Sequence, residues 1–149
     1  MQDLTVEQVL HWPKGKTPDA RAPRSGRELT MFHIRKAYLQ STFLRQGDCD
    51  LHIEISEQPD KRAPRMIVET PGMSDYCPAR REYYSKLAQA GFELTDANQE
   101  PARPIPVEVV GLAFRDESHP LWERRGSSKV RTLWELHPAI VRVLTDTQK

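Results

Sequence analysis

The sequence predicts a mainly β protein: a five-stranded Greek-key barrel with a single helix between its third and fourth strands. Segments rich in β-branched and aromatic residues recur five times between residues 30 and 144, each bounded by Pro, Gly or polar clusters. One helical pattern stands between the third and the fourth of them. This order, β-β-β-α-β-β, is that of the OB-fold, a small barrel. A generic α+β sandwich with the same elements is the competing architecture.

The boundaries follow from local signals. Pro78 suits the first turn of the helix and Gly91 its C-terminal end. Gly111 predicts a bulge or bend in the fourth strand, and Pro138 predicts an interruption or an edge position in the fifth. The predicted strands are residues 30–43, 51–56, 66–70, 107–114 and 132–144.

The N-terminal part has a different character. Residues 4–12 predict a short amphipathic helix with Thr5 as its cap. Residues 13–27 are rich in Pro, Gly and basic side chains and lack bulky apolar ones, which predicts an extended arm. The chain therefore divides into an N-terminal helix and basic arm, residues 1–27, and an OB-fold-like barrel domain, residues 28–149.

Length and composition set broad limits. A chain of 149 residues corresponds to one domain with a real hydrophobic core. Lys+Arg 22 against Asp+Glu 21 argues against indiscriminate binding to polyanions but permits a local basic patch. Cys49 and Cys77 predict two reduced thiols, with a single bridge between them as the alternative. The sequence shows no signal-peptide pattern and no apolar run of transmembrane length, so we expect a cytoplasmic protein without a membrane partner.

Two polar strings are the most informative local feature. Side chains alternate between the two faces of a strand, so Asp50, His52 and Glu54 share one face while the intervening Leu and Ile residues share the other. Glu135 and His137 repeat the pattern in the fifth strand. In an OB barrel the third strand lies between the second and the fifth, so Glu69 would link the two strings into one outer patch. The predicted patch comprises Asp50, His52, Glu54, Glu69, Asp116, His119, Glu135 and His137.

This patch permits more than one chemistry. His52, His137, Glu69 and Glu135 are of the types that bind zinc, manganese or iron, and such a site could direct water onto phosphate. The alternative is a cross-strand network that only stabilises the sheet. The sequence contains no HExxH, CxxC, GxSxG or Gly-rich phosphate motif, so we assign no catalytic residue and no cofactor beyond this candidate divalent metal.

The loop between the last two strands is the strongest candidate for a nucleic-acid contact. In OB-folds this loop flanks the binding groove. Basic side chains combined with an aromatic one suit a single strand with stacked bases, although acidic residues in the same loop oppose phosphate. The predicted ligand-binding residues are Trp122, Arg124, Arg125, Lys129 and Arg131.

Four segments, GDCDLHIEI, RMIVETP, VEVVGLAFRDESH and TLWELHPAI, resemble a group of uncharacterised bacterial proteins. That group shares D-x-D-x-H, I-x-E-x-P, G-x-(A/G)-F-(F/Y)-D-x-x-H and E-L-H-P-V motifs, and the likeness covers about residues 28–144. This chain departs from them with Arg115 at an aromatic position and Ala139 at the end of the last motif. The resemblance implies a coherent set without an established activity: Asp48, Asp50, His52, Glu69, Asp116, His119, Glu135, His137 and Pro138.

Three functions remain open. The leading hypothesis is a non-enzymatic OB-fold-like binding module for single-stranded DNA or RNA. A metal-dependent, phosphodiesterase-like hydrolase that uses the His/Glu patch is the first alternative. A structural or protein-interaction domain, in which the patch only stabilises the barrel and a protein is the partner, is the second.

Overall fold

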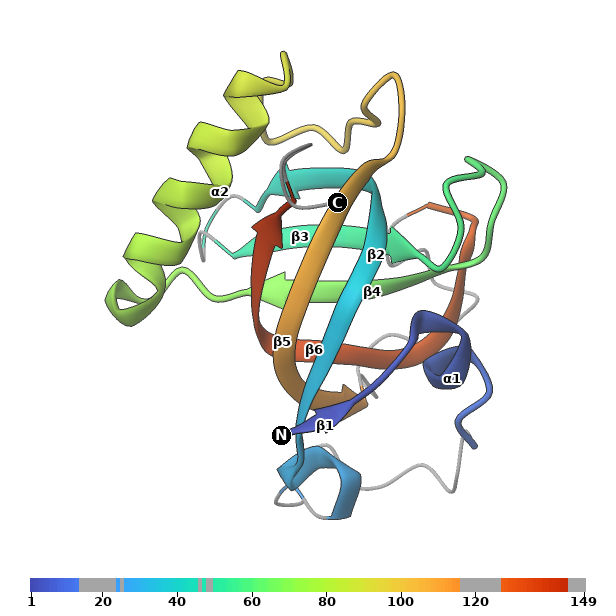
Figure 1. The fold of residues 1–149 in the computed structure, drawn as a ribbon. Coiled ribbons are helices and arrows are strands. Elements are labelled where there is room, and N and C mark those ends of the chain that lie inside the picture. Colours follow the sequence, from blue (N-terminus) through green and yellow to red (C-terminus); the bar gives the residue numbers. More distant parts are fainter. Residues whose placement is uncertain (14–23, 25, 46, 48–49, 116–126, 145–149) are drawn as a thin grey trace.

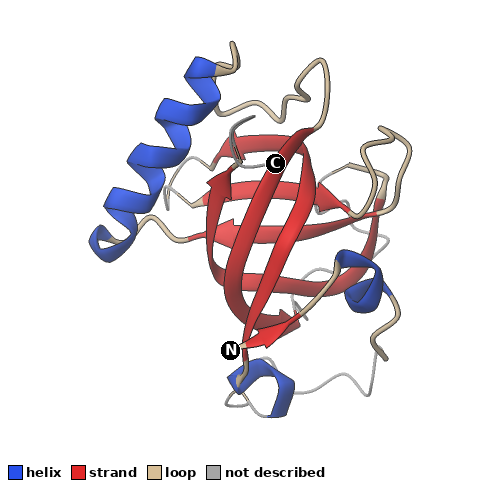
Figure 2. Ribbon diagram, viewed as in Figure 1, coloured by secondary structure: helices blue, strands red, loops and turns tan. Residues whose placement is uncertain are grey.

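The computed structural model describes residues 1–13, 24, 26–45, 47, 50–115 and 127–144. Its strands form a six-stranded sheet in the order β1-β2-β3-β4-β6-β5, and an additional β2–β5 pairing closes the last five into a barrel (Figures 1 and 2). The strands are β1 (Gln2–Asp3), β2 (Met31–Leu44), β3 (Leu51–Ser56), β4 (Arg65–Thr70), β5 (Ile105–Arg115) and β6 (Val130–Val143). The helices are α1 (Val6–Leu10), α2 (Cys77–Gln89) and the short 3-10 helices η1 (Gly26–Leu29) and η2 (Ser74–Tyr76).

The strand order confirms the predicted OB-fold-like barrel and excludes the sandwich. The strand pairs β2–β3, β3–β4, β5–β6 and β2–β5 are antiparallel, whereas β4 and β6 run parallel. The helix α2 lies between the third and the fourth barrel strands in sequence, as the periodicity predicts. β2 is long enough to pair with β5 over its first half and with β3 over its second, and this double pairing closes the barrel.

Two helices cover opposite ends of the barrel (Figure 1). Tyr83 and Leu87 of α2 are buried, and the Tyr83 hydroxyl donates to Thr42 Oγ1 at 2.8 Å. At the other end Val6 and Val9 of α1 join the same hydrophobic core. These contacts anchor the N-terminal helix to the barrel wall rather than leaving it on a separate arm.

The predicted N-terminal helix is confirmed, and its start has a clear cause. Thr5 and Gln8 form a capping box, in which the Thr5 hydroxyl accepts from the Gln8 backbone N–H and the Gln8 side chain accepts from the Thr5 N–H. Most of the predicted basic arm lies outside the described residues. No helix in the described part of the chain has the length and apolar character needed to cross a membrane.

The structure differs from the sequence prediction at two places. β6 runs through Pro138 and lies between β4 and β5, so Pro138 is not at a sheet edge; the predicted interruption is a register shift against β5 between Gly111 and Ala113. The two-residue strand β1, which the sequence did not predict, pairs parallel with β2. Its two residues carry too little pattern to be recognised.

Candidate functional site

The polar strings meet on the outer side of the barrel wall. His52 on β3 lies opposite Glu69 on β4, and Phe43 on β2 lies opposite His52 on the other side. Val68 pairs with Leu136 in the parallel β4–β6 ladder, so Glu69 and His137, the next residues, are neighbours. A row of side chains therefore crosses four adjacent strands.

Five of these side chains form a continuous acid–imidazole chain: Glu54, His52, Glu69, His137 and Glu135. His52 Nε2 lies 3.3 Å from Glu54 Oε2, and its Nδ1 lies 3.5 Å from Glu69 Oε1. His137 Nδ1 lies 3.3 Å from Glu69 Oε2 and 3.5 Å from Glu135 Oε1. Glu69 thus bridges the two imidazoles, in the linking position that the strand order predicts.

The carboxylates favour charged imidazoles. Burial by itself lowers the pKa of His52, but the hydrogen bonds to Glu54 and Glu69 outweigh burial and raise the pKa above 6.5. His137 behaves alike: burial lowers its pKa, and Glu135 and Glu69 together raise it above 6.5. For Glu69, burial raises the pKa but the two histidines hold it below its usual value. The neighbouring carboxylates thus favour the positively charged form of each imidazole in the acid–imidazole chain.

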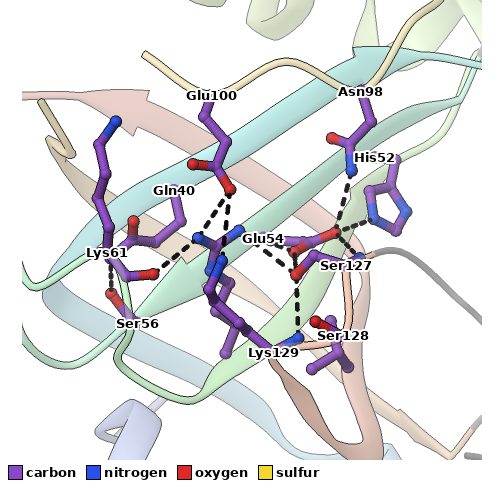
Figure 3. Close-up of polar contacts among 12 residues, drawn as sticks. Gln40, His52, Glu54, Ser56, Lys61, Asn98, Glu100, Ser127, Ser128 and Lys129 are labelled. Atoms are coloured by element: carbon purple, nitrogen blue, oxygen red, sulfur yellow. Dashed lines mark hydrogen bonds and ion pairs between the residues drawn. The ribbon is translucent and has the colours of Figure 1, made fainter. Parts of the chain in front are cut away.

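The Glu54 end of the acid–imidazole chain is closed to solvent. Glu54 and Arg65 are completely buried, with Arg65 Nη1 3.2 Å from Glu54 Oε1. Ser127 donates its backbone N–H and its hydroxyl to the Glu54 carboxylate at 2.9 Å and 2.6 Å. Asn98 donates to the same carboxylate, and Glu100 accepts from Arg65 at 3.0 Å (Figure 3). Segments from two loops therefore seal the barrel wall here.

These contacts dominate the ionisation of Glu54. Burial alone raises its pKa, yet the hydrogen bonds from His52 and Ser127 lower the pKa to about 2. Sequence reasoning missed both Arg65 and Ser127. Strand alternation from Glu69 through Ile67 would have placed Arg65 on the polar face, whereas nothing in the sequence indicates the Ser127 contact.

The predicted patch is less accessible than an outer surface. His52 is 4% exposed and Glu54 is 0% exposed, and every residue of β3 and β4 is buried. The expectation of one core face and one open face fails for these strands, because the segments carrying Asn98 and Ser127 cover the polar face at the Glu54 end.

The His137 end of the acid–imidazole chain is partly open to solvent. The His137 side chain is 27% exposed, and Asp50 is half-buried beside Glu69. One donor atom each from Asp50, Glu69 and His137 lie within 4.8 Å of one another. This group contains two of the four metal ligands predicted from the sequence, Glu69 and His137. Asp50 stands in the place of the other two, His52 and Glu135.

Aromatic and basic side chains border this open end. The Phe43 ring stacks on His52 at 4.6 Å between centroids, and the Phe114 ring meets His137 edge-on at 5.7 Å. Arg24 lies over Phe114, 4.9 Å from the ring centroid, and donates to the His137 backbone oxygen at 2.8 Å. Sequence reasoning missed all three of these residues as site members; Phe43 and Phe114 lie opposite His52 and Glu135 through a strand register that the sequence does not show.

The predicted basic loop is described only at its end. Lys129 Nζ lies 3.9 Å from Glu100 Oε1, and Arg131 donates to the Ser128 backbone oxygen. Cys77 is a free thiol, and its predicted alternative partner Cys49 is not among the described residues. The other predicted residues that lie outside the described part are Asp48, Asp116, His119, Trp122, Arg124 and Arg125.

No protein-family model matches the chain, and neither a curated protein nor a solved structure matches it significantly. The class to which the chain belongs is therefore defined by architecture alone: an OB-fold-like closed barrel with an acid–imidazole chain across its wall. The resemblance to uncharacterised bacterial proteins stays a prediction.

Proposed function

We propose that this protein is a non-enzymatic OB-fold-like module that binds single-stranded DNA or RNA across the open end of the β3–β4–β6 face. The observation that carries the proposal is the position of two half-buried rings, Phe43 and Phe114, on either side of the two histidines. OB-folds bind oligonucleotides on the face of their second and third strands, which are β3 and β4 here.

The aromatic side chains supply a surface for bases. Stacking of a base on an aromatic ring contributes roughly 1–3 kcal/mol and tolerates any sequence. Phe43 and Phe114 come from strands on opposite sides of the polar row, so a single strand that crosses the row meets both rings. Each ring already packs against an imidazole, which limits the entropy lost when a base stacks on it.

Charge along the row is compatible with a phosphate backbone. The raised pKa values of His52 and His137 favour cationic imidazoles, and these offset the carboxylates beside them. Arg24 borders Phe114, and the charge of the exposed Arg45 acts on Glu69. Cationic side chains beside stacking rings are the combination that single-strand binding requires.

The closed end supports a different role. Glu54 and Arg65 are wholly buried under protein segments, so a ligand cannot reach them without displacing Asn98 or Ser127. At this end the structural hypothesis fits better than the ligand-binding one, and the network stabilises the barrel. The proposal therefore confines the ligand to the end formed by His137 and its neighbours.

Binding is tested by fluorescence anisotropy with labelled single-stranded DNA and RNA at 50 and 200 mM salt. We expect affinity to fall steeply with salt, because binding a phosphate backbone releases counterions. Phe114→Ala should weaken binding by about tenfold, the loss of one stacked base. Tyr38→Ala is the matched control, since Tyr38 is a half-buried ring five residues from Phe43 on β2.

Two results would contradict the proposal: no salt-sensitive binding by the intact chain, or equal losses in the Phe114 and Tyr38 variants. The same labelled strand also tests the hydrolase alternative, which the Asp50–Glu69–His137 group favours. Incubation with Mn²⁺ followed by gel electrophoresis would give shortened products from a metal-dependent phosphodiesterase. An uncleaved DNA or RNA strand would exclude the phosphodiesterase, and the anisotropy measurement then decides whether the protein is a binding module.

A further inference from the structure

The geometry points to a binding site for a divalent transition-metal ion at the open end of the acid–imidazole chain. We propose that Asp50, Glu69 and His137 are its protein ligands, whose donor atoms lie within 4.8 Å of one another. This inference does not depend on nucleic-acid binding, because the three ligands and their supports belong to the protein alone.

The backbone brings the ligands together from β4, from β6 and from the residue just before β3. Asp50 immediately precedes β3, two residues before His52, so the antiparallel ladder sets it near the end of β4 that carries Glu69. The parallel β4–β6 ladder sets His137 beside Glu69. Glu69 and His137 lie on strands, where a site is held more precisely than on a loop, and this favours a defined coordination geometry.

Contacts around the ligands orient them. The Gly72 backbone N–H donates to Asp50 Oδ1 at 2.8 Å. His52 Nδ1 lies 3.5 Å from Glu69 Oε1, whereas His137 faces the other oxygen of that carboxylate, Oε2. Carboxylate and imidazole partners of this kind fix the ligands of metal sites in proteins. His52 would therefore position Glu69, and Gly72 would position Asp50, without contacting the ion.

The distance between two of the donor atoms is close to the distance between ligands of a bound metal ion. Donors about 2.1 Å from a zinc ion lie about 3.4 Å apart in tetrahedral geometry. The Glu69–His137 contact of 3.3 Å already has this value. The donor atom of the half-buried Asp50 lies within 4.8 Å of the other two.

The donor set selects the class of ion. Two carboxylates and one imidazole suit Zn²⁺, Mn²⁺ or Fe²⁺, whereas Mg²⁺ and Ca²⁺ prefer oxygen donors alone. Three protein ligands leave at least one coordination position, and the 27% exposure of the His137 side chain opens that position to water or to a ligand. Nearby Arg24 and Arg45 reduce the negative potential, so affinity should come from the donors rather than from net charge.

Isothermal titration calorimetry with ZnCl₂, on the full chain after removal of metals with a chelator, tests the site. We expect one equivalent of Zn²⁺ to bind with a dissociation constant below about 10 µM, and Mg²⁺ to bind at least about tenfold more weakly. Asp50→Asn and His137→Gln should each weaken Zn²⁺ binding more than about tenfold. Asp75→Asn, which changes an exposed acid on η2, is the matched control and should leave the affinity unchanged.

A rise in melting temperature on adding Zn²⁺, present in the intact chain and lost in Asp50→Asn, gives a second readout that does not require activity. Circular dichroism of each variant confirms that its fold is retained; Asp50→Asn keeps the test valid should His137→Gln unfold. The proposal is overturned by an absence of saturable Zn²⁺ binding. It is equally overturned by unchanged Zn²⁺ affinity in a folded Asp50→Asn variant.

Discussion

The buried Glu54–Arg65 pair shows how one residue can determine the integrity of the barrel wall. Both side chains are fully buried, so each charge depends on the other and on the Ser127 hydrogen bonds. Glu54→Gln removes the buried acid partner of Arg65 and leaves only Glu100, at the rim, as its acid partner; we expect the unfolding free energy to fall by about 3–5 kcal/mol. Urea denaturation at pH 7 measures the change.

Asp60→Asn is the matched control, because it removes an acid from the exposed Asp60–Arg62 pair, and its denaturation midpoint should not move measurably. Equal midpoints for Glu54→Gln and the intact chain would contradict the prediction. In that case the burial of Glu54 would carry no electrostatic contribution.

The same residue should govern acid stability. The pKa of Glu54 is lowered from 4.5 to about 2 in the folded protein, so its contribution is complete above pH 4.5 and is lost as the pH falls towards 2. We therefore expect the stability gap between the intact chain and Glu54→Gln to narrow over this range. Denaturation series at several pH values measure it, and a gap that stays constant would refute the prediction.

The contribution of His52 to stability should depend on pH in the opposite direction to that of Glu54. Its folded pKa is raised above 6.5, so its contribution is complete below pH 6.5 and is lost as the pH rises through the folded value. The intact, chelator-treated chain should be more stable than His52→Gln below pH 6.5, and this difference in unfolding free energy should shrink as the pH rises above that value. His11→Gln is the control, because its ring is 74% exposed; a matching pH response in both variants would argue against His52.

At the residue scale the sequence predicted the members of the acid–imidazole chain, because strand alternation and OB strand order together imply that Glu69 links the histidines. It did not predict the partners Asn98, Glu100 and Ser127. These lie in segments without periodicity, and their contacts arise from how loops fold back over the wall.

At the element scale, the close approach of β5 and β6 depends on Gly111. A Cβ added there would lie 2.8 Å from the Pro138 backbone oxygen and 2.9 Å from the Ala139 Cβ. We expect Gly111→Ala to lower the unfolding free energy by about 1–3 kcal/mol through overpacking. Thermal unfolding measures the change, with Ala88→Ser on the exposed face of α2 as the control. An unaltered melting temperature for Gly111→Ala would show that β5 and β6 can move apart to admit the methyl group at no cost.

The strand bounds were predicted to within two residues, because alternation and Pro or Gly punctuation are local signals. Pro138 was predicted to be an interruption or an edge, and only the edge alternative is wrong. A proline in a strand pattern predicts an edge or a break, but whether a bulge can accommodate it depends on the partner strand, here at Gly111 and Ala113.

At the scale of the whole molecule, the N-terminal helix is part of the barrel core. Leu4, Val6 and Val9 are buried with the barrel side chains. A chain shortened to residues 28–149 should therefore expose apolar surface and melt at a lower temperature than the full chain. Differential scanning calorimetry compares the two; equal melting temperatures would mean that the barrel is complete without α1.

The overall architecture was predictable because element order constrains a five-stranded barrel strongly. The covering of the polar face was not, since it depends on long-range contacts that leave no periodic trace. For the same reason the sequence predicted β3 as half-exposed, whereas the folded chain buries all of it.

The short strand β1 has a consequence for how the molecule meets other chains. It pairs with Phe32 and His33 on the side of β2 that does not face β5, and Asp3 is further held by Arg35. Without β1, the backbone of β2 at Phe32 and His33 would be unpaired on this side and could serve as a template for an incoming strand. With barrel closure and this cover, strand addition at this part of β2 is disfavoured, and we expect recognition to use side chains instead.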